Sequence, residues 1–295
     1  MRISDAYIAR TSTSRLSQLT DRLSTLQTQV SSGLRIQQAS DDPSGAVRAA
    51  QLHSGLSRID QYNTATDAAT GWVKAEDSAL GQITDTLRSA YDQGLQGANA
   101  TSTDARSTLA DSLDSLSNTL VQLGNTTYDG RYLFGGTQTT TPPFNGAPGA
   151  VSYTGDDTIR QATVGEGVQV VVNQPGSTVM GTNTQPDVFA TLHTLATALR
   201  NNDQAAITNG VQALNTNLTR ITNLRGDTGE RLQQLSLASD HLSSSKITLN
   251  SAVDDVEGVD ITQAIVDLKT QENLYTAASY VSSTLGRGGL LQWLR

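Results

Sequence analysis

A narrow stripe of apolar residues near the start of the chain most constrains how it can fold. Leucine or valine recurs at alternating steps of three and four residues, at Leu16, Leu19, Leu23, Leu26 and Val30. This heptad spacing places the five side chains along one side of a helix, with polar residues on its other faces. The predicted helix has about 15 residues and a length of about 22 Å. Such a stripe needs a second helix to cover it, either from this chain or from another molecule.

Similar stripes recur along the chain and predict a mainly α fold. The longest covers residues 43–94 and keeps its heptad register for six heptads, although its middle is polar. A helix of about 50 residues is about 75 Å long and forms a rod. Thr103 is the expected N-cap of the next helix. A second long seam covers residues 214–256, and Gly226 and Gly229 within it predict a local irregularity.

The breaks between the stripes carry recognisable signals. Residues 31–46, SSGLRIQQASDDPSGA, join the first two helices. Gly33 can adopt a positive φ and end the first helix, and Asp42 with Pro43 has the pattern of an N-cap and first helical residue. Near the other end of the chain, residues 258–260 predict a break followed by a cap.

The final predicted helix is the best internal partner for the opening stripe. It begins at Ile261, and Gly286, Gly288 and Gly289 are expected to interrupt its end. One face carries Ala264, Leu268, Tyr275, Ala278 and Leu285. The first and last segments are therefore expected to meet, with long helices running out and back. Both stripes are short and narrow, so use between molecules is nearly as strong an interpretation as use within one chain.

The composition changes between the helical stretches and predicts a small β-rich insert over residues 136–185. Five of the six prolines fall within residues 142–186. Short β-type runs occur at 151–154, 163–164 and 168–172. A unit of about 50 residues is marginally stable alone, so we expect it to lean on the helices. Helix is expected to resume at Pro186.

Aromatic residues mark the joint between the predicted stem and this insert. Tyr128 lies just before the turn at 129–130, and three further aromatic residues follow that turn. The joint is predicted to contain Gly130, Arg131, Tyr132, Phe134 and Phe144. A small local core is the favoured interpretation, and a contact with another protein is the alternative.

Composition argues against several classes of function. The net charge of −8 disfavours a general nucleic-acid binder. No run approaches 18 apolar residues, so no membrane partner is expected, and no signal-peptide pattern follows the first residues. Cysteine is absent, which excludes disulfides and thiolate metal sites. A chain without thiols suits either a reducing cytoplasm or export in the unfolded state.

Catalytic and metal-binding patterns are weak, and neither an enzyme nor a cofactor or metal site is expected. The three histidines are far apart in sequence, and Asp41 and Asp42 precede Pro43 in a way that capping explains. A solvated helix end is preferred to a cation site for the acidic group of Asp254, Asp255, Glu257 and Asp260. The alternatives from other classes are a hydrolase using Asp156 and Asp157 and a cytoplasmic helical adaptor.

Two stretches resemble the bacterial flagellin superfamily. Residues 31–46, with their Ser-Gly, Arg-Ile and Asp-Asp-Pro elements, resemble its N-terminal signature. GRYLFGG at 130–136, followed by Pro143 and Phe144, is similar to the marker of its hook–filament junction proteins. The ends of the chain, MRIS and LLQWLR, also resemble those proteins, although Trp293 stands where tyrosine is more usual. The resemblance covers both ends and the stem and leaves out the β-rich insert.

The resemblance implies a structural, non-enzymatic subunit of the bacterial flagellum. Such a subunit would form a ring of identical copies that joins the hook, through hook-associated protein 1, to the flagellin filament. A flagellin that builds the filament itself is the alternative. The subunit would be exported unfolded by the flagellar type III apparatus, without a cleaved signal, and would become extracellular. A cytoplasmic chaperone would hold its C-terminal helix before export.

The same resemblance implies three functional divisions. Residues 1–42 with 260–295 would be the inner-tube assembly domain, residues 43–135 with 186–259 the rod, and residues 136–185 the outer domain. The stripes predict the assembly interface, and its short helices are expected to order only when neighbouring copies cover them. That interface is predicted to contain Leu16, Leu19, Leu23, Leu26, Val30, Ile261, Ile265, Leu268 and Tyr275.

Overall fold

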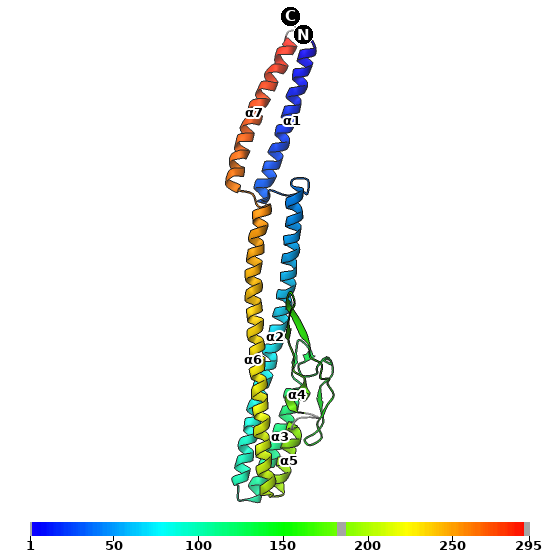
Figure 1. The fold of residues 1–295 in the computed structure, drawn as a ribbon, viewed down its shortest axis with the longest axis vertical. Coiled ribbons are helices and arrows are strands. Elements are labelled where there is room, and N and C mark those ends of the chain that lie inside the picture. Colours follow the sequence, from blue (N-terminus) through cyan, green and yellow to red (C-terminus); the bar gives the residue numbers. More distant parts are fainter. Residues whose placement is uncertain (1, 182–186, 292–295) are drawn as a thin grey trace. The chain divides into compact units, whose positions relative to one another are not determined.

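The computed structural model describes residues 2–181 and 187–291, and within them the chain is mainly α-helical, as predicted. These residues form seven helices and three small antiparallel sheets of two strands each (Figure 1). Contacts within the chain group it into two units: Ile59–Ser244, and the residues before and after that range. Helices α2 (Pro43–Asn99) and α6 (Gln204–Glu257) contribute to both units.

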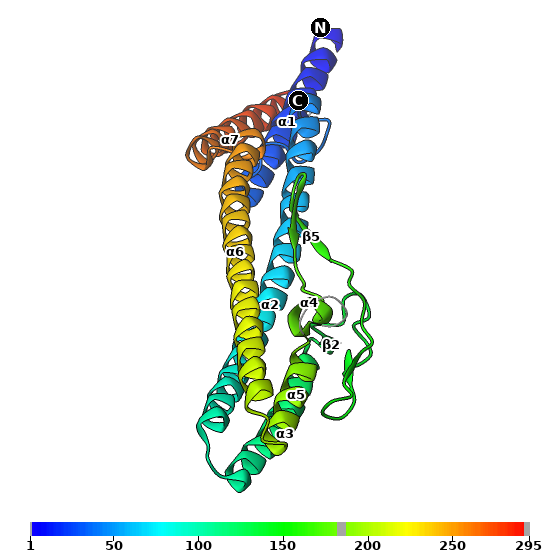
Figure 2. The same ribbon diagram turned by 60° about the horizontal axis from the view of Figure 1, so that its bottom comes forward.

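The unit that contains both ends of the chain is built on helices α1 (Arg2–Ser32) and α7 (Ile261–Leu291). The two helices lie side by side and run antiparallel (Figures 1 and 2). Helix α1 has 31 residues, about twice the predicted length, because it extends well before the leucine stripe. Helix α7 continues through its three late glycines, so the expected interruption was wrong. Glycine lowers helix propensity, but it keeps the backbone donor and acceptor that a helix needs.

The connections within this unit agree with the sequence signals. Gly33 ends α1 with φ +74°. The Asp42 side chain accepts a hydrogen bond of 3.0 Å from the Gly45 N–H, and Pro43 is the first residue of α2. Asp260 accepts a bond of 3.1 Å from the Gln263 N–H and caps α7. Each cap satisfies a backbone donor that the first turn of a helix leaves unpaired.

The second unit is a helical bundle with a small β part. Parts of α2 and α6 pack there with α3 (Thr103–Gly124), α5 (Val188–Arg200) and the short α4 (Gly176–Met180). Two predicted boundaries move slightly. Ser102, not Thr103, caps α3. Asp187 caps α5, so that helix begins after the expected Pro186, which lies outside the described residues.

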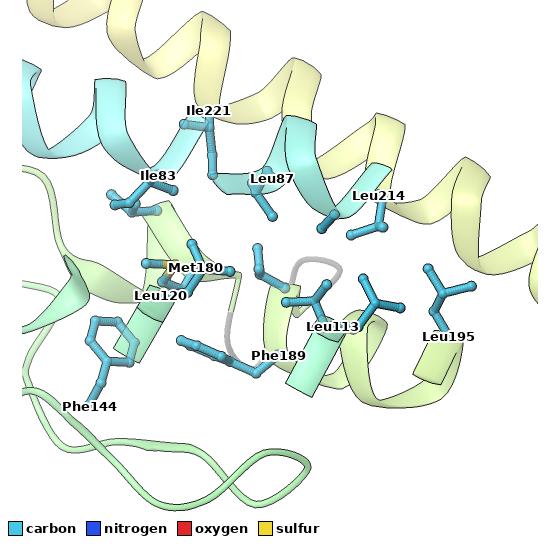
Figure 3. Packing of buried hydrophobic residues seen from close by; sticks show 14 of the residues in the cluster. Ile83, Leu87, Leu113, Leu120, Phe144, Met180, Phe189, Leu195, Leu214 and Ile221 are labelled. Carbon is cyan, nitrogen blue, oxygen red and sulfur yellow. The ribbon is translucent and has the colours of Figure 1, made fainter. Parts of the chain in front are cut away.

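The core of this unit joins the long seams to the shorter helices. Large side chains from α2, α3, α5 and α6 interlock, with Met180 of α4 between them (Figure 3). The predicted seam residues Leu80 and Leu87 are fully buried there. The labelled members of the cluster are Ile83, Leu87, Leu113, Leu120, Phe144, Met180, Phe189, Leu195, Leu214 and Ile221. The heptad pattern therefore identified the apolar side of both long helices.

Helix α6 is continuous through Gly226 and Gly229, so the irregularity expected there was wrong. A Cβ atom added at either glycine would meet no atom within 4 Å. Neither glycine is therefore required by a close contact or by a left-handed backbone.

We expect alanine to act in opposite directions at Gly229 and Gly33. Gly229→Ala should raise the free energy of unfolding by about 0.5–1 kcal/mol, because it improves helix propensity at an exposed position. Gly33→Ala should lower it by about 1–2 kcal/mol, because only the left-handed backbone there opposes a side chain. Urea unfolding of both variants followed by circular dichroism measures the two changes. Changes of the same sign would contradict this account.

The β part begins at the turn after α3. Strands β1 (Thr127–Tyr128) and β2 (Arg131–Tyr132) form a hairpin whose two turn residues, Asp129 and Gly130, both have positive φ. Such two-residue turns match the twist of paired strands. Strands β3 (Phe144–Asn145) and β4 (Ser152–Tyr153) form the next pair.

The last strand pair attaches the β part to the long helices. Strands β5 (Gln161–Gly165) and β6 (Val168–Val171) form a hairpin with a bulge. Val164, Val170 and Val172 pack in a second apolar cluster with Ala69 and Val73 of α2 and Leu235 of α6. The insert therefore leans on the helical stem, as its small size predicted.

Candidate assembly interface

The opening stripe lies against α7, the internal partner that the sequence pattern indicated. All five stripe residues are half-buried, and the residues between them are mostly exposed. On α7, Ala264 and Gln271 are buried and Leu268 is half-buried. The Gln271 side-chain amide also donates a hydrogen bond of 3.3 Å to the Leu19 carbonyl of α1.

The pairing of α1 with α7 leaves space between the helices. A hollow of about 430 Å³ is lined by Arg22, Thr25 and Leu26 of α1 and by Asp267, Thr270 and Gln271 of α7. The hollow is open to solvent, so the two helices do not cover each other completely along this stretch.

Helix α7 exposes apolar side chains on faces that α1 does not cover. Of its predicted interface residues, Ile261, Ile265 and Tyr275 are exposed, and only Leu268 lies toward α1. Sequence reasoning missed four further exposed apolar residues: Val266, Leu274, Tyr280 and Val281. Successive helix residues are about 100° apart, so Ile261, Tyr280 and Leu274 point in three well-separated directions. A count of apolar residues around the whole helix, rather than along one seam, would have found them.

The same unit contains a joint at which the ends of four helices are held together. The Arg35 N–H donates to the Glu257 carbonyl at 2.6 Å, and the Val259 N–H donates to the Gly33 carbonyl at 3.0 Å. The Arg35 guanidinium donates to the Val256 carbonyl at 2.8 Å. His53 Nε2 lies 3.0 Å from a Glu257 carboxylate oxygen. The sequence predicted neither the contact of Arg35 nor that of His53, because each joins residues more than 200 positions apart in the chain. Arg35 was noted only as part of the family signature.

The neighbouring acidic residues hold the backbone of this joint: Asp41 accepts bonds within the loop, and Asp42 caps α2. Backbone N–H groups of Gln38 and Gln37 lower the pKa of Asp41, and the Gly45 N–H and the Ser44 hydroxyl lower the pKa of Asp42. The acidic side chains near Glu257 do not meet at a common point that could hold a cation. No cluster of three or more metal-type ligands occurs among the described residues. Leu285 and Trp293 lie outside the side chains that the structure describes.

The predicted stem–module residues separate into two sets. Gly130 and Arg131 are exposed in the β1–β2 hairpin and Tyr132 is half-buried. Phe134 and Phe144 are fully buried in the core of the bundle, and the Phe144 ring centroid lies 5.7 Å from that of Phe189.

Tyr153 completes this joint and was missed by sequence reasoning. Its ring centroid lies 5.2 Å from that of Phe144, and its hydroxyl lies 3.0 Å from the Phe134 carbonyl oxygen. Burial raises the pKa of Tyr153 to about 12. Its β-type run was recognised in the sequence, but the aromatic partner could not be assigned from spacing alone.

The carboxylates of the hydrolase alternative hold loops instead. Asp156 accepts bonds from the Thr137 hydroxyl and from the backbone N–H groups of Thr137 and Thr158, which together lower its pKa to about 2. Asp157 accepts a bond from the Ser177 hydroxyl. A general base needs a free lone pair and a pKa nearer neutrality, so this pair is poorly suited to catalysis.

Sequence comparison assigns both ends of the chain. The N-terminal helical region of bacterial flagellin matches residues 3–139, and its C-terminal helical region matches residues 211–294. Flagellar hook-associated protein 3 of Salmonella typhimurium is 29% identical over 254 residues, which cover 77% of this chain and 80% of that protein. The protein of the same name from Escherichia coli is 28% identical with the same coverage.

Solved structures show the same fold. A putative flagellar hook-associated protein from Vibrio parahaemolyticus has a TM-score of 0.69 at 23% identity, covering 74% of this chain and all of that one. The flagellar junction protein of Legionella pneumophila has a TM-score of 0.60 at 17% identity, covering 72% of this chain and all of that one.

The structure contains no helix, among the residues it describes, with the length and apolar character of a membrane span. The resemblance found in the sequence is confirmed by the two matching regions and by the hook-associated relatives. The two regions include all of α3 and α7 and all of α1 except Arg2. The chain belongs to the bacterial flagellin family, a family of structural proteins of the flagellum and not of enzymes.

Proposed function

We propose that this protein is the subunit that joins the flagellar hook to the flagellin filament. The observation that carries the proposal is the exposure of apolar side chains around α7 beyond the face that α1 covers. Exposed apolar patches on a protein surface mark sites that another molecule covers. The curated relatives are named hook-associated protein 3, and the Legionella relative is named a junction protein.

In this proposal the α1–α7 pair is the assembly element. Ile261, Ile265 and Tyr275 contact neighbouring copies, while the leucine stripe of α1 first holds α7 and is buried further as copies close around it. The ring of copies contacts hook-associated protein 1 on one side and flagellin on the other. The assignment of residues 1–42 with 260–295 to the inner tube, and of 136–185 to the outer surface, belongs to the same proposal.

The apolar surface of α7 also requires protection before assembly. An exposed apolar helix promotes aggregation at cellular concentrations. A cytoplasmic chaperone that covers α7 until export would prevent this, and the unfolded chain would then pass through the flagellar type III apparatus. A chain without cysteine cannot form disulfides on arrival outside the cell.

Locating the protein in sheared flagella tests the proposal. Immunogold labelling is expected to mark one short zone at the hook end of each filament, at a copy number far below that of flagellin. A deletion strain should secrete flagellin without building filaments. Label along the whole filament would support the flagellin alternative, and protein retained in the cytoplasm would overturn both.

A further inference from the structure

A set of buried polar residues, here called the polar layer, lies where α2, α6 and the segment after β6 meet in the Ile59–Ser244 unit. Glu76 of α2 is 0% exposed, and Gln174, which follows β6, is 2% exposed. The Gln174 side-chain amide donates to the Leu224 carbonyl at 3.1 Å and to the Thr228 hydroxyl at 3.2 Å, both on α6. Gln174 therefore ties the end of the β part to one long helix, and its neighbour Glu76 belongs to the other.

Several polar atoms of this layer have no hydrogen-bond partner among the described residues. They are both carboxyl oxygens of Glu76, the side-chain oxygen of Gln174, one terminal nitrogen of Arg231 and the indole nitrogen of Trp72. No ion pair joins Glu76 to Arg231 in the described part of the chain. A buried carboxylate without donors is unfavourable, whereas a neutral carboxyl carries a hydrogen that an unpaired acceptor can receive. The side-chain oxygen of Gln174 is such an acceptor.

We propose that Glu76 is a proton-dependent latch, whose neutral carboxyl holds the segment after β6 against α2 and α6 and whose ionisation loosens that contact. In the closed state the Glu76 O–H donates to the Gln174 side-chain oxygen. In the ionised state the carboxylate repels that oxygen and needs donors that the closed packing does not supply. Arg231 must then approach Glu76, which disturbs the layer.

The surroundings of Glu76 favour its neutral form on balance, because burial outweighs the groups that oppose it. Burial raises the pKa of Glu76 to about 8, while Arg231 and the backbone amide of Gln174 lower it in part and Asp77 adds to the rise. That amide lies near the carboxyl without forming a hydrogen bond of normal geometry. Asp77 is itself paired with Arg225 of α6 at 3.2 Å.

Trp72 provides a built-in reporter of the latch. It lies one helical turn before Glu76 on the same side of α2. Its ring centroid lies 6.1 Å from that of Tyr128 in β1, and the Arg160 guanidinium lies 4.6 Å from its centroid. Tyr128 and Arg160 both belong to the β part. Movement of that part against α2 therefore changes the surroundings of the indole.

A pH titration of full-length protein with Trp293→Phe tests the proposal, since Trp72 is then the only tryptophan. Its emission spectrum is expected to shift in one transition between pH 6 and 9.5. Glu76→Gln, which mimics the neutral carboxyl, should remove the transition, and Asp77→Asn, a control at the adjacent carboxylate, should keep it. An unchanged spectrum across this range in the protein that retains Glu76 would overturn the latch.

Unfolding by urea provides the second measurement. A folded-state pKa above the unfolded value means that the folded protein binds more protons, so stability falls as pH rises from about 4.5 to about 8. The equilibrium constant for folding of Glu76→Gln should be at least tenfold larger than that of the parent protein at pH 9. At pH 4.5 the two constants should be about equal. A Glu76→Gln protein that unfolds more easily at pH 9, or fails to fold, would contradict the proposal, because its amide represents the closed state.

Discussion

Ile265→Asp is expected to abolish incorporation into the flagellum while the monomer stays folded. Ile265 is 45% exposed on α7. A substitution at such a surface usually changes the free energy of unfolding by less than about 0.5 kcal/mol. In the assembled state the aspartate would be buried without a partner, at a cost of several kcal/mol in every copy. A loss of about 3 kcal/mol already corresponds to roughly a 100-fold weaker association.

Ile159→Asp is the matched control for this experiment. Ile159 is an exposed isoleucine of the β part and belongs to the Ile59–Ser244 unit, so the same change of charge should leave incorporation intact. Far-ultraviolet circular dichroism of both purified variants checks folding, and immunoblots of sheared flagella measure incorporation. Normal amounts of Ile265→Asp in the flagellar fraction would exclude this face of α7 from the interface.

The structure makes Ile265 a sharper target than the leucine stripe that first suggested an interface. Leu23 is half-buried against α7 within one chain. A charge at Leu23 would therefore disturb both the helix pair and its contacts with neighbours, and one result could not separate the two causes. Ile265 is more exposed than Leu23, so its substitution disturbs the helix pair less and reports mainly on association.

Heptad spacing predicted the buried side of the long helices, because a repeat near 3.6 residues specifies one helix face without knowledge of its partner. It gave too short an α1, since the residues before Leu16 lack the leucines that made the stripe visible. The low helix propensity of glycine also led to a wrong prediction at Gly226 and Gly229, where the structure has 54 residues of continuous helix. Cap positions moved by one or two residues, because neighbouring polar side chains compete to cap the same turn.

The candidate sites were predictable where the signal was local and not where it depended on tertiary contacts. The caps at Asp42 and Asp260 could be recognised from adjacent residues. The bonds of Arg35 and the aromatic contact of Tyr153 could not, since each joins distant segments. Glu76 gave the least signal, because a glutamate beside a polar part of the seam is usually solvated. Its burial is visible only in the folded structure, where Glu76 is 0% exposed.

Phe144→Ala is expected to lower the free energy of unfolding of the Ile59–Ser244 unit by about 3–5 kcal/mol, the usual cost of removing a fully buried phenylalanine ring. The ring contacts Tyr153 and Phe189 and fills the space beside Gly124, whose added Cβ would lie 2.6 Å from it. Urea unfolding followed by circular dichroism measures the loss. Ile159→Ala, at an exposed position of the same β part, should change the value by less than about 0.5 kcal/mol.

A small loss for Phe144→Ala would assign the joint to backbone bonds instead of to the ring. The Asn125 side chain accepts from the Phe144 N–H at 2.9 Å and donates to the Phe144 carbonyl at 2.7 Å, and both bonds survive the alanine substitution. Asn125→Ala removes both bonds and keeps the ring, with an expected loss of about 1–3 kcal/mol because the backbone groups are left without their partners. A larger loss for Asn125→Ala than for Phe144→Ala would contradict the aromatic core as the main attachment of the β part. We expect the larger loss for Phe144→Ala, since burying the ring contributes more free energy than the two hydrogen bonds do.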